Sequence, residues 1–109
     1  MRDQRIGRRS GSSRARRRSA EYTALGHAAR VLRAKARLSQ QEAGDRAGLH
    51  RNYVGAIERG EINPSLRVLL RLVRGLGVPL SELINDYEDV RQAMAGGSTV
   101  GIARKSSRR

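Results

Sequence analysis

The sequence predicts an all-α fold, a compact domain of five short helices flanked by basic tails. Apolar residues recur three and four positions apart along residues 20–94, which places them on one face of a helix. No stretch alternates between apolar and polar residues as a half-buried strand does. Serine, glycine and proline separate the apolar stretches and suit helix caps and turns. The 109 residues accommodate one small domain with tails.

The first helix is expected to begin at Thr23, whose hydroxyl is a suitable cap, and to end near Arg37. Most of its cationic side chains lie off the apolar stripe, which leaves that stripe free to pack. The stripe consists of Leu25, Ala28, Ala29, Leu32 and Ala36.

The second helix is expected over residues 40–46. Ser39 precedes it as the N-cap, and Glu42 follows three residues later, which is the spacing of a capping box. Gly48 then stands where the chain must turn sharply, because glycine adopts a positive φ without a Cβ clash.

The third helix is expected over residues 51–58, with His50 near its N-cap and Gly60 as its stop. Val54 and Ile57 are expected to point inward. Two short helices joined by a tight turn form a helix-turn-helix unit, whose second helix has the shape to enter a DNA major groove. This part of the chain therefore predicts a DNA-binding element.

The fourth helix is expected over residues 65–76, between the turn signal Asn63-Pro64-Ser65 and a stop at Gly77. Its apolar face is expected to hold Leu66, Leu69, Leu70, Val73 and Leu76.

The fifth helix is expected to open with Ser81 as its cap and to bury Leu83 and Ile84. Its length beyond Asn85 is open. An apolar stripe continues there with Tyr87, Val90 and Met94. These three residues have no obvious place in the core, so they are candidates for a dimer surface, although a plain surface helix explains them nearly as well.

Charge divides the chain into a nearly balanced core and two cationic tails. The net charge is +13, and residues 1–19 carry eight arginines against one aspartate. Residues 95–109 carry three arginines and one lysine, whereas residues 20–94 hold eleven basic and nine acidic side chains. Such tails bury too little apolar surface to offset their ordering entropy, so we expect them to be disordered and drawn to polyanions.

Composition argues against several function classes. With no cysteine, the chain has no disulfide framework and no thiolate metal site. His27 and His50 lack partner ligands at useful spacing, so no metal or other cofactor is expected. No catalytic side-chain set or phosphate-cradling glycine loop indicates an enzyme. No apolar run predicts a membrane span or a signal peptide, so we expect a cytoplasmic bacterial protein without a membrane partner.

Several short motifs occur together in a characteristic order. They are Leu25-Gly26, Arg33, Leu38-Ser39-Gln40-Gln41-Glu42, Gly48-Leu49, Tyr53-Val54, Ile57-Glu58-Arg59-Gly60, Asn63-Pro64-Ser65-Leu66 and Leu76-Gly77-Val78-Pro79-Leu80-Ser81-Glu82-Leu83. On these motifs, residues 25–84 resemble the Cro/repressor-type (XRE-like) helix-turn-helix domain of phage repressors and small bacterial regulators. The resemblance implies a five-helix, lambda-repressor-like DNA-binding domain.

The chain departs from this family in the second helix, where Ala43-Gly44 replaces the usual Leu-Ala. Glycine inside a helix costs about 0.5–1 kcal/mol relative to alanine. We therefore expect this helix to be looser than in the family.

The resemblance implies that the start of the third helix meets base edges, through Arg51, Asn52 and Ala56. Arginine can donate two hydrogen bonds to guanine, asparagine can pair with adenine, and the alanine methyl group can touch thymine. The alternative is that Arg51 and Asn52 are polar residues on a solvated helix face, and that Ala56 only permits close approach.

Phosphate contacts are implied at Ser39, Gln40, His50 and Arg59, although Ser39 and His50 also suit pure capping roles. Arg33 and Glu58 match a structural ion pair of the family. The N-terminal arm adds a cluster close to the first helix, and a homeodomain arm is its analogue. The cluster consists of Arg14, Arg16, Arg17 and Arg18.

The sequence thus predicts a sequence-specific, DNA-binding transcriptional regulator, with repression as the favoured sign. Its partner is double-stranded DNA, read as a homodimer on a near-palindromic operator in the nucleoid. Two alternatives remain: an antitoxin or other protein-interaction module with a toxin or regulator as partner, and nonspecific nucleic-acid coating by the tails. The operator, the effector and the dimer interface remain open.

Overall fold

The computed structural model describes residues 19–96, which form five helices and no strand. In chain order the helices are α2 (Ala20–Lys35), α3 (Gln40–Ala47), α4 (Arg51–Glu58), α5 (Leu66–Leu76) and α6 (Leu80–Met94). The all-α prediction is confirmed. Both tails, with the arm arginines, lie outside the described residues apart from Ser19, Ala95 and Gly96, so their expected disorder stays a prediction.

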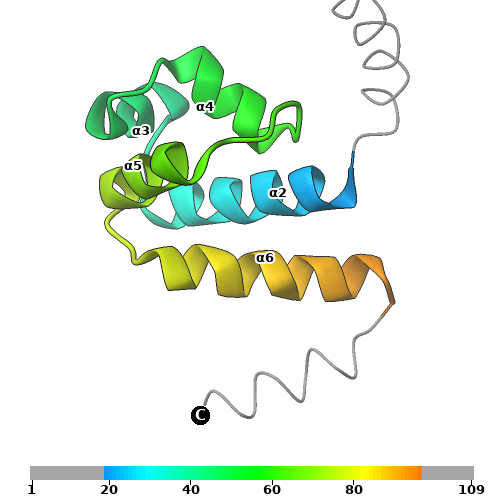
Figure 1. Ribbon diagram of the computed structural model, residues 1–109. Helices are drawn as coiled ribbons and strands as arrows, with labels where there is room; N and C mark the ends of the chain where they lie inside the picture. The colour runs from blue at the N-terminus through cyan, green and yellow to red at the C-terminus, as the bar shows by residue number, and fades with distance from the viewer. Residues whose placement is uncertain (1–18, 97–109) are drawn as a thin grey trace, which may run out of the picture.

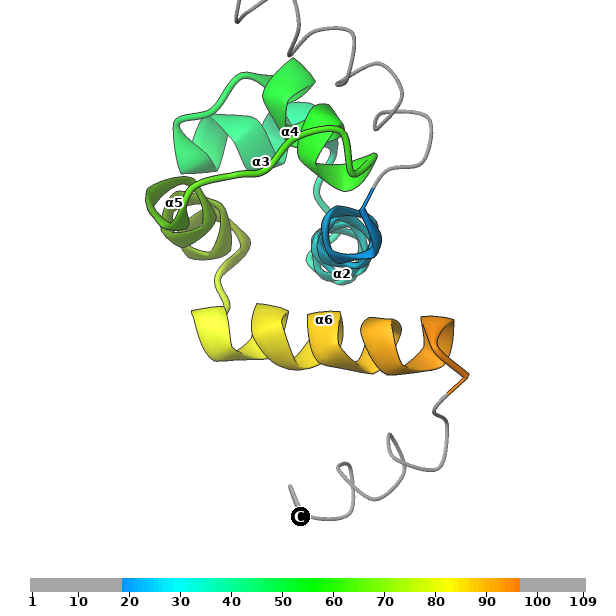
Figure 2. The same ribbon diagram turned by 45° about the vertical axis from the view of Figure 1, so that its right-hand side comes forward.

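Helix α2 forms the centre of the domain (Figure 1). It packs on α6 on one side and on α4 on the other, while α3 packs against both α4 and α5. Figure 2 shows α2 nearly end-on, with α4 and α6 on opposite sides of it and α5 beside it. This arrangement holds the helix-turn-helix unit, α3 and α4, away from α6.

The first helix begins three residues before the expected cap. The Ser19 hydroxyl accepts a hydrogen bond from the Tyr22 N–H at 3.0 Å, so Ser19 is the N-cap and the prediction of Thr23 was wrong. At the other end, Arg37 adopts a φ of +61° and the Leu38 N–H bonds to the Arg33 carbonyl. This reversal returns Leu38 to the core.

The apolar face predicted for α5 is partly wrong. Leu66 and Leu70 are 62% and 40% exposed, whereas Leu72 is buried together with Val73 and Leu76. Aliphatic residues occupy so many positions of this helix that its sequence fits more than one stripe. Packing against α3 selects the stripe that includes Leu72, because Gly75 lets α5 lie close to Ala47 of α3.

Helix α6 begins at Leu80 with Pro79 in the cap position and no side-chain cap, so the expectation of Ser81 as cap was wrong. Leu83 is fully buried, as expected, and Ile84 is half-buried. The helix runs to Met94, and Tyr87 packs against the core. This contact accounts for Tyr87 within the domain.

The core is built mainly from small and aliphatic side chains. Its buried members are Ala28, Ala29, Leu32, Leu38, Ala43, Ile57, Leu72, Val73, Leu76 and Leu83. An ion pair between Arg91 and Glu21, at 3.6 Å, adds a surface link between α6 and α2. The core positions α3 and α4 as one unit on α2 and α5.

Candidate nucleic-acid interface

A capping box fixes the start of α3. The Ser39 hydroxyl accepts a hydrogen bond from the Glu42 N–H at 3.0 Å, and the Glu42 carboxylate accepts one from the Ser39 N–H at 2.8 Å. Hydrogen bonding from the Ser39 backbone is the main cause that lowers the pKa of Glu42. The predicted capping box is confirmed, and it presents the N-terminus of α3 at the surface.

The turn between α3 and α4 depends on two glycines. Gly48 ends α3 in the left-handed conformation with φ +72°. Gly44 lies inside α3, where a Cβ atom would overlap the carbonyl oxygen of Leu49. Gly44 therefore lets the turn lie close against α3, a role that compensates for its expected helix-propensity cost.

The N-terminus of α4 presents the predicted base-reading residues. His50 is the N-cap, and its Nδ1 accepts a hydrogen bond from the Asn52 N–H at 3.0 Å. Arg51 and Asn52 are exposed on the first turn, while Ala56 is half-buried one turn further along. The structure therefore brings these three residues to one surface, since Val54 and Ile57 point into the core as predicted.

Two of the predicted phosphate ligands are occupied within the chain. The Gln40 amide donates to Glu58 Oε1 at 3.0 Å. Arg59 donates to both carboxylate oxygens of Glu61, at 2.8 and 3.2 Å, which raises the pKa of Arg59. Each side chain keeps N–H groups that these bonds do not use, so a phosphate would share it with its carboxylate partner. The sequence spacing gave no sign of either pairing.

Ser39 and His50 are better placed for an anion. Both are exposed, and both stand at a helix N-terminus. His50 Nδ1 accepts a hydrogen bond, so the proton of the neutral imidazole lies on Nε2. The Nε2–H group can therefore donate a hydrogen bond to a phosphate oxygen. The capping roles therefore leave room for backbone contacts.

The predicted ion pair between Arg33 and Glu58 is confirmed. Arg33 Nε and Nη2 donate to Glu58 at 2.6 and 3.1 Å, and Arg33 Nη1 donates to the Leu38 carbonyl at 2.7 Å. The Glu58 side chain is only 4% exposed, and its carboxylate is the main cause that raises the pKa of Arg33. The pair joins α2, the α2–α3 loop and the end of α4, so it orients the reading helix.

The start of α2 lies beside the end of α4. A Cβ atom on Gly60 would be 3.0 Å from the Thr23 Cα, so the backbones nearly touch here. The first turn of α2, which Ser19 caps, therefore lies next to the helix-turn-helix unit. Arg14, Arg16, Arg17 and Arg18 lie outside the described residues.

Within residues 19–96, no three metal-ligating side chains gather at one place. None of the helices described is long and apolar enough to span a bilayer. The exposed chemistry of this surface is that of a helix-turn-helix domain, with an arginine and an asparagine at the start of its second helix.

Comparison with known proteins places the chain in a family. The Helix-turn-helix family model matches residues 30–83. The control protein C.MunI of Mycoplasma sp is 39% identical over 59 residues, which cover 54% of this chain and 80% of that protein. The restriction-modification controller protein C.AhdI from Aeromonas hydrophila has a similar structure with a TM-score of 0.59 and 38% identity, covering 60% of this chain and 98% of that one. The chain belongs to the helix-turn-helix family.

Other relatives are matched over a smaller share of their length. The immunity repressor protein of Bacillus phage phi105 is 28% identical over 71 residues, which are 65% of this chain and 49% of that protein. The chain spans about half the length of several curated relatives that it matches.

Proposed function

We propose that this protein is a sequence-specific DNA-binding transcriptional regulator that represses its target genes. The observation that carries the proposal is the exposed first turn of α4, where Arg51 and Asn52 project from a helix-turn-helix unit. Several relatives are named as repressors or control proteins, which supports this function and its sign. Its site of action is then the nucleoid in the bacterial cytoplasm.

Recognition begins with α4 in the major groove. Arg51 donates to O6 and N7 of a guanine, and Asn52 pairs with an adjacent adenine. Ala56 offers a methyl group to thymine. Ser39 and His50 contact the flanking phosphates and fix the register of the helix. Two copies related by a two-fold axis read the two halves of a near-palindromic operator.

The arm is proposed to add phosphate contacts. Its last arginine, Arg18, directly precedes the N-cap of α2 in the sequence, and α2 begins beside the end of α4. Each phosphate that it neutralises steepens the dependence of log K on log salt by about 0.9. Replacing Arg14, Arg16, Arg17 and Arg18 with glutamine therefore reduces the slope by up to about 3.6.

Fluorescence anisotropy tests the function with labelled DNA from the gene's own upstream region and an excess of random competitor. The full chain should prefer the upstream DNA. Arg51→Ala should lower the discrimination at one base pair by about 1–3 kcal/mol. Arg30→Ala is the matched control, because it removes the same charge from an exposed position on α2.

Two results would count against the proposal. If Arg51→Ala and Arg30→Ala weaken binding equally on every sequence, α4 does not read bases. The second result has two parts: the wild-type chain shows no preference for the upstream DNA, and replacing the four arm arginines with glutamine abolishes binding. The protein then coats nucleic acid through its tails. In that case the protein binds DNA through the charge of its tails and not through its helix-turn-helix unit.

A further inference from the structure

Two side-chain hydrogen bonds connect α3 to the first turn of α4. Gln41 Nε2 donates to Asp45 Oδ1 at 3.0 Å, and Arg51 Nη1 donates to Gln41 Oε1 at 3.4 Å. All three residues are exposed, and none belongs to the hydrophobic core. These two bonds, the α3–α4 link, therefore act on the position of surface side chains rather than on burial.

The Asp45 carboxylate determines how the Gln41 amide is turned. The two residues stand four positions apart on α3, which brings their side chains together on one face of the helix. A carboxylate only accepts hydrogen bonds, so the amide nitrogen must face Asp45 and the amide oxygen is left to face Arg51. The opposite orientation would place two acceptors together at Asp45 and two donors together at Arg51.

The partner of Arg51 differs in charge from the partners of other arginines in the domain. Arg33 and Arg59 are held by carboxylates, at 2.6 and 2.8 Å, which offset their charge. The Gln41 amide is neutral, and its longer bond occupies only one N–H donor of the Arg51 guanidinium. The positive charge and the other donors stay available, and a guanine needs a pair of them.

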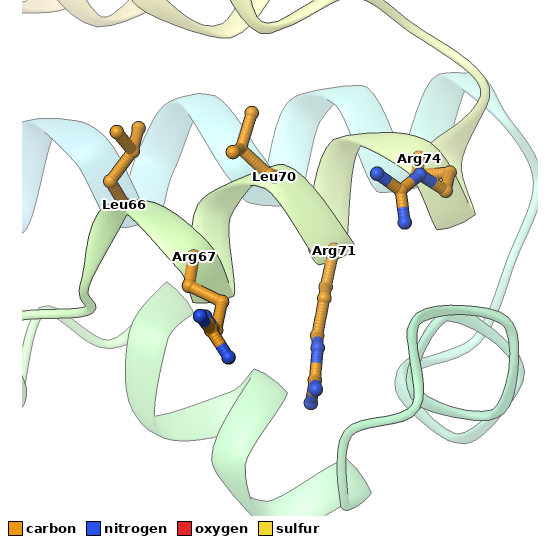
Figure 3. Close-up of a pocket in the computed structure, with 5 residues that line it drawn as sticks. All are labelled: Leu66, Arg67, Leu70, Arg71 and Arg74. Carbon is orange, nitrogen blue, oxygen red and sulfur yellow. The ribbon is translucent and has the colours of Figure 1, made fainter.

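Three arginines on α5 show the contrast. Arg67, Arg71 and Arg74 are exposed and take part in none of the side-chain hydrogen bonds or ion pairs found within residues 19–96. Figure 3 shows Arg67 and Arg71 pointing away from the two leucines that line the same groove. Side chains without a partner keep their rotamer freedom and lose it only when they bind. Arg51 has already lost part of this freedom through the α3–α4 link.

We propose that Gln41 and Asp45 are positioning residues for the arginine that reads the operator. Asp45 orients the Gln41 amide, and the amide holds Arg51 before it meets a guanine. Neither residue needs to touch a base. The inference rests on the proposed function and deepens it, because a side chain ordered in advance favours the sequence that it contacts and gives no advantage on other DNA.

Loss of the α3–α4 link should reduce the discrimination at the base pair that Arg51 reads. Gln41→Met keeps the length of the side chain and removes both bonds, whereas Asp45→Ala removes the acceptor that orients the amide. Ordering one long side chain again costs a factor of about two to ten in affinity, so each variant should lose discrimination by that factor. Both new residues favour a helix, and circular dichroism should show unchanged folding.

The charge removed with Asp45 needs a control of its own. Asp45→Ala should raise the affinity for all DNA, because it takes one negative charge from the domain. Glu88→Ala is the matched control, since it removes the same charge from an exposed position on α6. It should raise the affinity for all DNA as well and leave the discrimination unchanged.

Fluorescence anisotropy with the upstream DNA and a set of single base-pair substitutions measures these effects. The base pair that Arg51 reads is the one whose substitution weakens wild type but not Arg51→Ala. Gln41→Met should weaken wild type on the upstream DNA and should not weaken Arg51→Ala further. An equal effect in both backgrounds, a loss spread over all base pairs, or an equal loss of discrimination in Glu88→Ala and Asp45→Ala overturns the inference.

A measurement without DNA separates this inference from the proposed function. Relaxation of the Arg51 Nε–H group, measured by ¹⁵N NMR on the full chain, gives its order parameter. It should be higher in wild type than in Gln41→Met or Asp45→Ala, and higher than that of Arg71. Equal values overturn the inference even when the chain prefers its upstream DNA. The expected order in a wild-type chain without any DNA preference overturns the proposed function, and with it the use of the α3–α4 link in reading.

Discussion

The ion pair between Arg33 and Glu58 is the contact whose removal we expect to destabilise the domain most. The Glu58 carboxylate accepts two hydrogen bonds from Arg33 and one from Gln40, and its side chain is 4% exposed. Replacing Glu58 with methionine keeps most of the volume and removes all three acceptor contacts. The Arg33 guanidinium then retains only the Leu38 carbonyl.

The magnitude follows from the burial of the partner left behind. Removing one member of a buried pair costs about 3–5 kcal/mol. The Arg33 side chain is 17% exposed, so water partly solvates the charge left on it and the lower figure, about 3 kcal/mol, applies. For a domain of this size, that loss lowers Tm by about 12–24 °C.

A double-mutant cycle measured by urea unfolding separates the pair from its surroundings. Arg33→Met and Glu58→Met should each destabilise strongly, whereas the double variant should recover part of the loss because it leaves neither charge without its partner. Glu61→Ala is the control, since it breaks a similar arginine–carboxylate pair that is largely exposed, and should change stability little. A coupling energy below about 0.5 kcal/mol would refute the reasoning.

Three further changes test how the backbone is built. Gly26→Ala should destabilise the domain by about 1–3 kcal/mol, because the new Cβ would overlap the Ile57 carbonyl. Gly55→Ala should be tolerated, because its Cβ meets only the ends of flexible side chains. Thermal unfolding of the two variants tests this difference. Arg37→Gly should raise Tm, because glycine adopts the positive φ found there without the strain of a side chain. Glu42→Gln should be less stable than wild type at neutral pH. The lowered pKa of Glu42 means that its charged form stabilises the fold above its unfolded pKa, and that this contribution disappears as pH falls through the folded pKa, so the difference should vanish in acid.

Sequence reasoning was most accurate where the determinant is local. The starts of α3 and α4 and the turn between them were predicted because Ser39, Gly48 and His50 act on backbone groups within a few residues. These caps depend little on tertiary packing. The ion pair between Arg33 and Glu58 required the family resemblance, since its members are 25 residues apart.

The failures have a common cause in tertiary packing. The sequence of α5 fits more than one apolar stripe, and only its contact with α3 decides that Leu72 is buried and Leu66 is not. Likewise, nothing in the sequence indicated that Gln40 would bond to Glu58, because that bond exists only once α3 and α4 are packed together. Gln40 and Arg59, which motif position assigns to phosphate, thus have hydrogen-bond partners within the chain.

These internal partners imply a division of roles between the domain and the tails. Arg33 and Arg59 are held by carboxylates, so neither is freely available to phosphate, whereas Arg51 contacts only the neutral Gln41, at 3.4 Å. We therefore expect the arginines of the tails to add much of the attraction to DNA, and α4 to select the sequence. Salt weakens the tail contacts on any DNA to a similar degree. We therefore expect rising salt to lower the affinity for operator and for random DNA by similar factors, and to leave their ratio nearly unchanged.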